Sequence, residues 1–76
     1  MKVIVYSTPT CPWCKRAKQF FDENNVEYID YDVSVDQEKA QEMIKKSGQM
    51  GVPVVDIDGQ ITVGFDEKTI REMLKL

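Results

Sequence analysis

The sequence predicts an α/β fold in which a four-stranded mixed sheet is flanked by three helices. Segments rich in β-branched and aromatic residues alternate with segments whose apolar residues recur at helical spacing, in the order β-α-β-α-β-β-α. The strand, helix and strand at the start imply a parallel pair with a right-handed crossover, and Asp58-Gly59 is typical of a tight hairpin between two later strands. Residues 1–76 are therefore expected to form one domain.

The first half of the chain predicts two strands separated by a helix. Residues 2–6 are dominated by β-branched and aromatic side chains and end at Ser7-Thr8-Pro9, which favours a short, buried strand. Pro12 suits the first position of a helix, Asn24-Asn25 ends the helical pattern, and the apolar face carries Ala17, Phe20 and Phe21. The composition of residues 26–33 favours a second strand.

The second half predicts a helix, a hairpin and a final helix. Asp36 is suited to cap a helix whose apolar residues are Ala40, Met43 and Ile44, and Gly48 follows where a left-handed C-terminal residue is expected. Residues 54–57 and 60–63 form the two strands of the hairpin. Asp66 is suited to cap the last helix, whose apolar face consists of Ile70, Met73 and Leu74.

The composition argues against several classes of function. The net charge is -3 and the charges are interspersed, so no basic stripe is available to neutralise nucleic-acid phosphates. The longest apolar run, residues 3–6, is far shorter than the ~20 residues of a membrane helix and too short for the core of a secretory signal. The chain contains two Cys and no His, so a metal site would need an unusual set of ligands. We expect a cytoplasmic monomer that binds neither nucleic acid nor a membrane.

The segment Cys11-Pro12-Trp13-Cys14 lies where the first strand passes into the first helix. Residues three apart on a helix share a face at about 5 to 6 Å, which a disulfide can bridge. Such a bridge closes a very short loop and therefore stabilises the fold little. A Cys-x-x-Cys pair beside a βαβ pattern instead indicates a redox motif.

The two cysteines are predicted to have unequal roles. Cys11 lies at the helix start, where free N–H groups and the helix dipole favour a thiolate, so it is the expected nucleophile. Cys14 is expected to be less exposed and to act as the resolving thiol. Two questions stay open: Lys15 and Lys18 either favour the thiolate or form a solvated face, and Trp13 either packs locally or offers a docking surface.

Together these residues resemble a known family. Tyr6 ends a strand, Thr10-Cys11-Pro12-Trp13-Cys14 opens a helix, Val52-Pro53 precedes a hairpin, and Gly64-Phe65-Asp66 precedes the last helix. The whole chain resembles the glutaredoxins, and more closely the short bacterial glutaredoxin-like redoxins. The resemblance implies the thioredoxin fold in its minimal form, with Cys11 as the attacking thiolate and Cys14 as its resolving partner.

The resemblance also implies a site for glutathione as reducing co-substrate. It implies a cis Val52-Pro53 bond that turns the Val52 backbone toward the sulfurs, where it pairs with the cysteinyl part of glutathione. Asp66 and the Phe65 backbone would hold the γ-glutamyl end, although Asp66 is equally well explained as a plain helix cap. Gln49 matches a position that often contacts the glycyl carboxylate.

Two departures from the family pattern keep alternatives open. Ser7-Thr8-Pro9 stands where many glutaredoxins have a Lys, and Val63-Gly64-Phe65 replaces the usual Gly-Gly and a small or polar residue. The leading hypothesis is an enzyme that reduces protein disulfides or glutathione mixed disulfides and is recharged by glutathione. The departures favour a second hypothesis, in which the chain is a redoxin that is recharged by thioredoxin reductase and donates electrons to a partner such as ribonucleotide reductase. A third is an iron-sulfur carrier that uses Cys11 of two chains, although such members usually lack Pro12.

Overall fold

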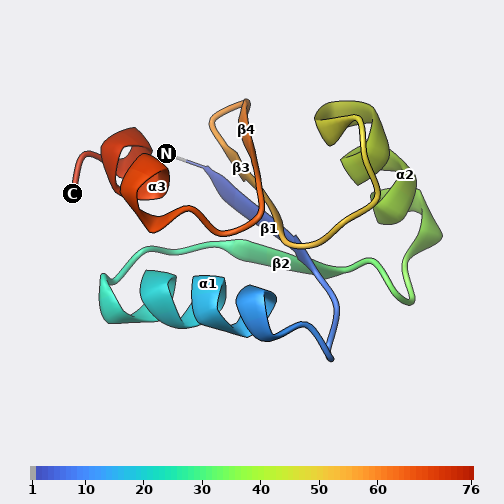
Figure 1. The fold of residues 1–76 in the computed structure, drawn as a ribbon, viewed down its shortest axis with the longest axis horizontal. Helices are drawn as coiled ribbons and strands as arrows, with labels where there is room; N and C mark the ends of the chain where they lie inside the picture. The colour runs from blue at the N-terminus through green and yellow to red at the C-terminus, as the bar shows by residue number, and fades with distance from the viewer. Residues whose placement is uncertain (1) are drawn as a thin grey trace.

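The computed structural model describes residues 2–76 and contains the predicted order of strands and helices. The four strands form one sheet in the order β2-β1-β3-β4 (Figure 1). Strand β1 pairs with β2 in parallel and with β3 antiparallel, and β3 pairs antiparallel with β4. The predicted fold class is thus confirmed. The elements are β1 (Val3–Ser7), α1 (Pro12–Glu23), β2 (Ile29–Asp32), α2 (Gln37–Ser47), β3 (Val54–Ile57), β4 (Gln60–Val63) and α3 (Glu67–Leu74).

The helices cover both faces of the sheet. Side chains of β1 and β3 alternate between the faces, as the period of a strand requires. On one face α1 and α3 pack over an apolar cluster made of Val3, Val5, Ala17, Phe20, Phe21, Val55, Ile57 and Ile70. On the other face α2 packs alone, over a smaller cluster made of Ile4, Tyr6, Met43 and Val54 (Figure 1).

Caps and turns lie where the sequence predicts them. Asp36 is the N-cap of α2, and Gly48 ends that helix in the left-handed conformation with φ 75°. Asp58 and Gly59 join β3 to β4 with φ values of 50° and 89°, the conformation that a two-residue hairpin of this kind requires. Asp66 is the N-cap of α3.

The predicted strand over residues 26–33 is too long, because only Ile29–Asp32 is a strand. Asn25 takes φ 56° at the end of α1, and the Val26 N–H then donates to the Phe21 carbonyl at 2.8 Å. The backbone at Val26 therefore closes the helix and does not join the sheet. Val26 and Tyr28 still pack against the cluster beneath α1, which explains their apolar character.

The first strand is displaced by one residue from the prediction. It extends to Ser7, which pairs with Asp32 and is buried. Lys2 precedes the strand, and its N–H donates to the Asp58 carboxylate at 2.7 Å. The extension brings Ser7 to the edge of the loop that carries Cys11.

The helices are short. They contain 12, 11 and 8 residues, so the longest spans about 18 Å. Among residues 2–76, no helix combines the length and the apolar character needed to cross a membrane.

Candidate active site

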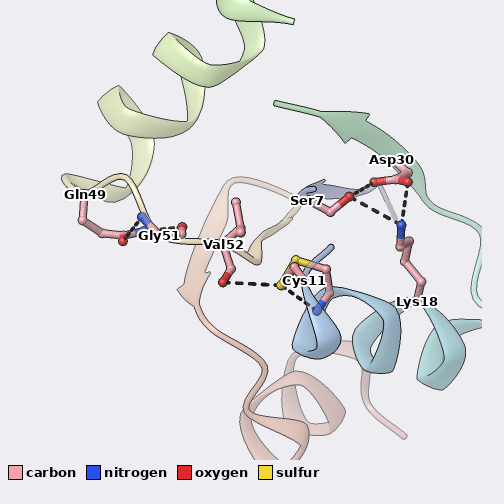
Figure 2. The surroundings of a disulfide bond; sticks show 8 residues. Ser7, Cys11, Lys18, Asp30, Gln49, Gly51 and Val52 are labelled. Carbon is pink, nitrogen blue, oxygen red and sulfur yellow. Dashed lines mark hydrogen bonds and ion pairs between the residues drawn. A yellow bond between two sulfur atoms is a disulfide. The ribbon is translucent and has the colours of Figure 1, made fainter. Parts of the chain in front are cut away.

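The cysteine pair lies at the start of α1, joined by a disulfide (Figure 2). Cys11 is the N-cap of the helix in an extended conformation, and Pro12 occupies the first helical turn. The Cα atoms of Cys11 and Cys14 are 5.2 Å apart, within the range that a disulfide spans. The turn before the helix is closed by the Cys11 N–H, which donates to the Thr8 carbonyl at 3.3 Å.

The two sulfurs differ in environment. Cys14 is fully buried, whereas Cys11 is partly exposed. The Cys14 N–H donates to Cys11 Sγ at 3.1 Å, so the sulfur takes the place of the Ser or Asp oxygen that usually caps a helix. A thiolate at this position is stabilised by that N–H and by the positive end of the helix dipole.

The backbone of Val52 forms the wall opposite Cys11. The Val52-Pro53 bond is cis, as the resemblance implies. The Val52 carbonyl oxygen lies 3.8 Å from Cys11 Sγ (Figure 2). Pro53 is fully buried, and its carbonyl accepts a hydrogen bond from the Gly64 N–H at 2.8 Å. The segment that leads into α3 is therefore attached directly to the residue after Val52.

The lysines of α1 have different surroundings. Lys18 Nζ lies 2.9 Å from Asp30 Oδ2 and 3.5 Å from Ser7 Oγ, so its charge is paired with a carboxylate (Figure 2). Lys15 is exposed and lines a shallow hollow together with Trp13. Trp13 is 58% exposed, and the Arg16 guanidinium lies 5.8 Å from the centroid of its ring, so the side chain lies on the surface of α1.

The other predicted glutathione contacts lie on two segments. Gln49 is in the loop between α2 and β3, where its amide hydrogen-bonds to Gly51. Phe65 is half-buried, with its ring centroid 5.6 Å from that of Phe20. Asp66 is exposed and caps α3 through hydrogen bonds from Thr69, which hold the pKa of Asp66 below its ordinary value.

Three residues around the site escape prediction from the sequence. Buried Ser7, the last residue of β1, donates to Asp30 Oδ1 on the neighbouring strand β2 at 2.6 Å. Gly51 provides the backbone groups that Gln49 contacts. The only signal in the sequence is that a short loop with Gly before Pro favours an irregular backbone.

Comparisons with known proteins agree with this geometry. The chain matches the glutaredoxin family over residues 3–62. An uncharacterized glutaredoxin-like 8.6 kDa protein in the rubredoxin operon of Clostridium pasteurianum is 44% identical over 71 residues, covering 93% of this chain and 95% of that protein. Glutaredoxin 3 of Escherichia coli strain K12 is 37% identical over 65 residues, covering 86% and 78%.

A solved structure gives the same picture in three dimensions. The crystal structure of a mutant of the thioredoxin-like protein BC3987 matches with a TM-score of 0.92 and 32% identity, covering 97% of this chain and 95% of that one. The relatives and the solved structure thus cover most of the chain, and they agree with the geometry of the cysteine pair at the start of α1. The chain belongs to the glutaredoxin family of thiol–disulfide oxidoreductases.

Proposed function

We infer that this chain reduces protein disulfides or glutathione mixed disulfides through a dithiol cycle in which Cys11 attacks and Cys14 resolves. The observation that carries this proposal is the unequal exposure of the two bonded cysteines, of which only Cys11 has accessible surface. An external disulfide therefore meets Cys11 first, at the position where the helix start favours a thiolate. The chain would act as a monomeric domain in the cytoplasm, where thiols are kept reduced.

The cycle consists of four thiol–disulfide exchanges. The Cys11 thiolate attacks one sulfur of the substrate, forms a mixed disulfide and releases the first substrate thiol. The Cys14 thiolate then attacks Cys11 Sγ, releases the second substrate thiol and forms the disulfide seen in the structure. One glutathione thiolate attacks Cys11 Sγ and frees Cys14, and a second attacks the bound glutathione, which regenerates Cys11 and releases oxidised glutathione.

The glutathione groove would lie between the Val52-Pro53 segment and the segment that leads into α3, which are joined by the hydrogen bond from the Gly64 N–H to the Pro53 carbonyl. The Val52 backbone, whose carbonyl lies close to Cys11 Sγ, would pair with the cysteinyl part of glutathione as an added strand would. Asp66 and the Phe65 backbone at the start of α3 would hold the γ-glutamyl end. The expected contact of Gln49 with the glycyl carboxylate stays a prediction.

A second reductant is favoured by two observations. The Phe65 ring packs against Phe20, and this bulky residue stands where the family pattern has a small or polar one. The loop before Cys11 carries no cation to bind a glutathione carboxylate. Recharging by a thioredoxin reductase, followed by electron transfer to a partner such as ribonucleotide reductase, is the alternative that these features support.

Coupled recharging assays separate the two reductants. The oxidised protein is mixed with NADPH and either glutathione with glutathione reductase or thioredoxin reductase, and NADPH consumption is followed. Rapid consumption with the glutathione system supports the main proposal. Rapid consumption with thioredoxin reductase alone would overturn glutathione as the reductant.

Serine variants test the two cysteine roles. Cys11→Ser is expected to abolish reduction of both substrate types, because the nucleophile is lost. Cys14→Ser is expected to lose reduction of protein disulfides but to keep reduction of glutathione mixed disulfides, because glutathione can resolve the adduct on Cys11 in place of Cys14. Full activity of Cys11→Ser would contradict the proposal.

A further inference from the structure

We propose that Gln49 is a positioning residue for the exchange at Cys11: its side-chain amide holds Gly51, and Gly51 sets the Val52 carbonyl against Cys11 Sγ. The inference rests on the proposed function, because it gives Gln49 a part in that reaction. It differs from the role that the resemblance implies, in which Gln49 binds the glycyl carboxylate of glutathione.

The amide of Gln49 contacts both polar groups of the Gly51 backbone (Figure 2). The Gly51 N–H donates to Gln49 Oε1 at 2.5 Å, and Gln49 Nε2 donates to the Gly51 carbonyl at 3.0 Å. The N–H and the carbonyl belong to the two peptide planes on either side of Gly51. The pair of hydrogen bonds therefore orients the plane that leads directly into Val52.

Ser47 completes the arrangement from the last turn of α2. Gln49 Nε2 donates to Ser47 Oγ at 3.3 Å, and Ser47 Oγ itself lies 2.7 Å from the Met43 carbonyl. A side-chain amide has two N–H donors, so both donors of Gln49 are already used within the protein. Binding a carboxylate would require breaking one of these bonds.

Gly51 is the residue type that leaves room for this contact. A Cβ at position 51 would lie 2.7 Å from Gln49 Oε1, well inside van der Waals contact. The atom that it meets is the end of a flexible side chain, so alanine at this position would displace the amide and leave the backbone path open. Gly51→Ala therefore removes the same contact as Gln49→Ala by an independent route.

The effect on chemistry passes through Val52. Its carbonyl lies 3.8 Å from Cys11 Sγ, on the edge where the backbone of a substrate would be added. Loss of the amide contact would let this edge move relative to the sulfur. A displacement of about 1 Å at a reacting group is sufficient to slow a reaction by up to 10²-fold, and we expect a loss of about tenfold.

Single-turnover reduction by the pre-reduced protein tests the proposal with two substrates. One is a mixed disulfide of glutathione with a small thiol, and the other is a disulfide peptide with an amidated C-terminus and no glycyl carboxylate. Gln49→Ala and Gly51→Ala are each expected to slow both reactions about tenfold. The double variant is expected to be no slower than either single variant, because both remove the same contact. Gln41→Ala, at an exposed position on α2, is the matched control and is expected to react like the wild type.

Hydrogen exchange at the Gly51 amide gives a readout that does not depend on turnover. The amide is expected to be protected in the wild type and to exchange about tenfold faster in Gln49→Ala. Slowing of the glutathione substrate alone, with the disulfide peptide reduced at the wild-type rate, would instead identify Gln49 as a carboxylate ligand and overturn the inference. A wild-type protein that reduces neither substrate would overturn the proposed function and this inference together. Gly51 is exposed, so Gly51→Ala decides the question even if Gln49→Ala folds poorly.

Discussion

The two faces of the sheet are stabilised by different chemistry. Beneath α1 and α3 the core is made of apolar side chains, with Phe21 fully buried at its centre. Beneath α2 polar groups enter the interior: Lys46 Nζ lies 2.7 Å from Asp56 Oδ2 and 2.8 Å from the Tyr6 hydroxyl. Tyr6 in turn donates to Glu42. The first face depends on packed volume, whereas the second combines a smaller apolar cluster with hydrogen bonds to charged groups, so the two faces should respond differently to substitution and to pH.

The charges beneath α2 support one another. Partial burial lowers the pKa of Lys46, but its hydrogen bonds to Asp56 and Tyr6 outweigh burial and raise that pKa above its ordinary value. The hydrogen bond from Tyr6 lowers the pKa of Glu42. Burial raises the pKa of Tyr6. At neutral pH the group is therefore a charged lysine between carboxylates, with a neutral phenol.

The largest effect is expected from Phe21→Ala beneath α1. Removing a fully buried aromatic ring leaves a cavity and reduces the free energy of unfolding by about 3–5 kcal/mol. That is a large part of the total for a chain of this size. Denaturant unfolding measures the loss. Val35→Ala, which truncates a 79% exposed side chain, is the control and should change stability by less than about 0.5 kcal/mol.

Lys46→Met tests the polar face. It removes the partner of Asp56, whose side chain is only 9% exposed, and should lower the free energy of unfolding by about 2 kcal/mol. Adding Asp56→Asn should recover part of the lost stability, because the uncompensated charge disappears. The Gly59 N–H, which donates to Asp56 Oδ1 at 2.8 Å, keeps an acceptor in this double variant. Additive losses in the double variant would show that the two side chains do not act as a pair.

A smaller effect is expected at the N-cap of α2. Asp36 Oδ1 accepts from the Lys39 N–H at 3.1 Å, so Asp36→Ala leaves that donor without its partner. The expected loss in thermal or denaturant unfolding is about 1 kcal/mol, and Asp36→Asn should retain most of the stability because asparagine is also a good cap. Equal losses in both variants would assign the effect to charge and not to capping.

The smallest effect is expected in the pH dependence of Glu42. Its pKa in the folded protein lies below the unfolded value, so its contribution is present above the unfolded pKa and is lost as pH falls through the folded pKa. The wild type should therefore lose more stability than Glu42→Gln between about pH 6 and pH 3, by on the order of 0.5 kcal/mol for this partly exposed group. Denaturant unfolding across this range measures the difference, and parallel curves for the two proteins would exclude the contribution.

Elements with a regular pattern could be predicted from the sequence. The hairpin follows from Asp58-Gly59 between two short strands, and α1 follows from Pro12 and the spacing of its apolar residues. The strand over residues 26–33 was predicted too long because Val26 and Tyr28 are apolar for a different reason: they cover the core from a loop. An apolar composition indicates that a segment is buried, but burial alone does not distinguish a strand from a packed loop.

The site could be predicted only in part. The placement of Cys11 at the helix start and the burial of Cys14 follow from local geometry, because a helix start is recognisable in the sequence. The polar contacts of Gln49 and Ser7 could not be predicted, since each depends on a backbone path that brings a loop or a strand end back to the side chain.

The sulfur cap at the start of α1 couples the redox state of Cys11 to the stability of the helix. The Cys14 N–H donates to Cys11 Sγ in the disulfide, and it would donate to a thiolate on Cys11 in the same way. Thermodynamic reciprocity then requires that any free energy the helix start contributes to the anion also stabilises the helix. A mixed disulfide or an alkyl group on Cys11 removes the charge and weakens this first turn. Each step of the cycle therefore also changes the folding free energy slightly, through the same residues at which substrate and product exchange.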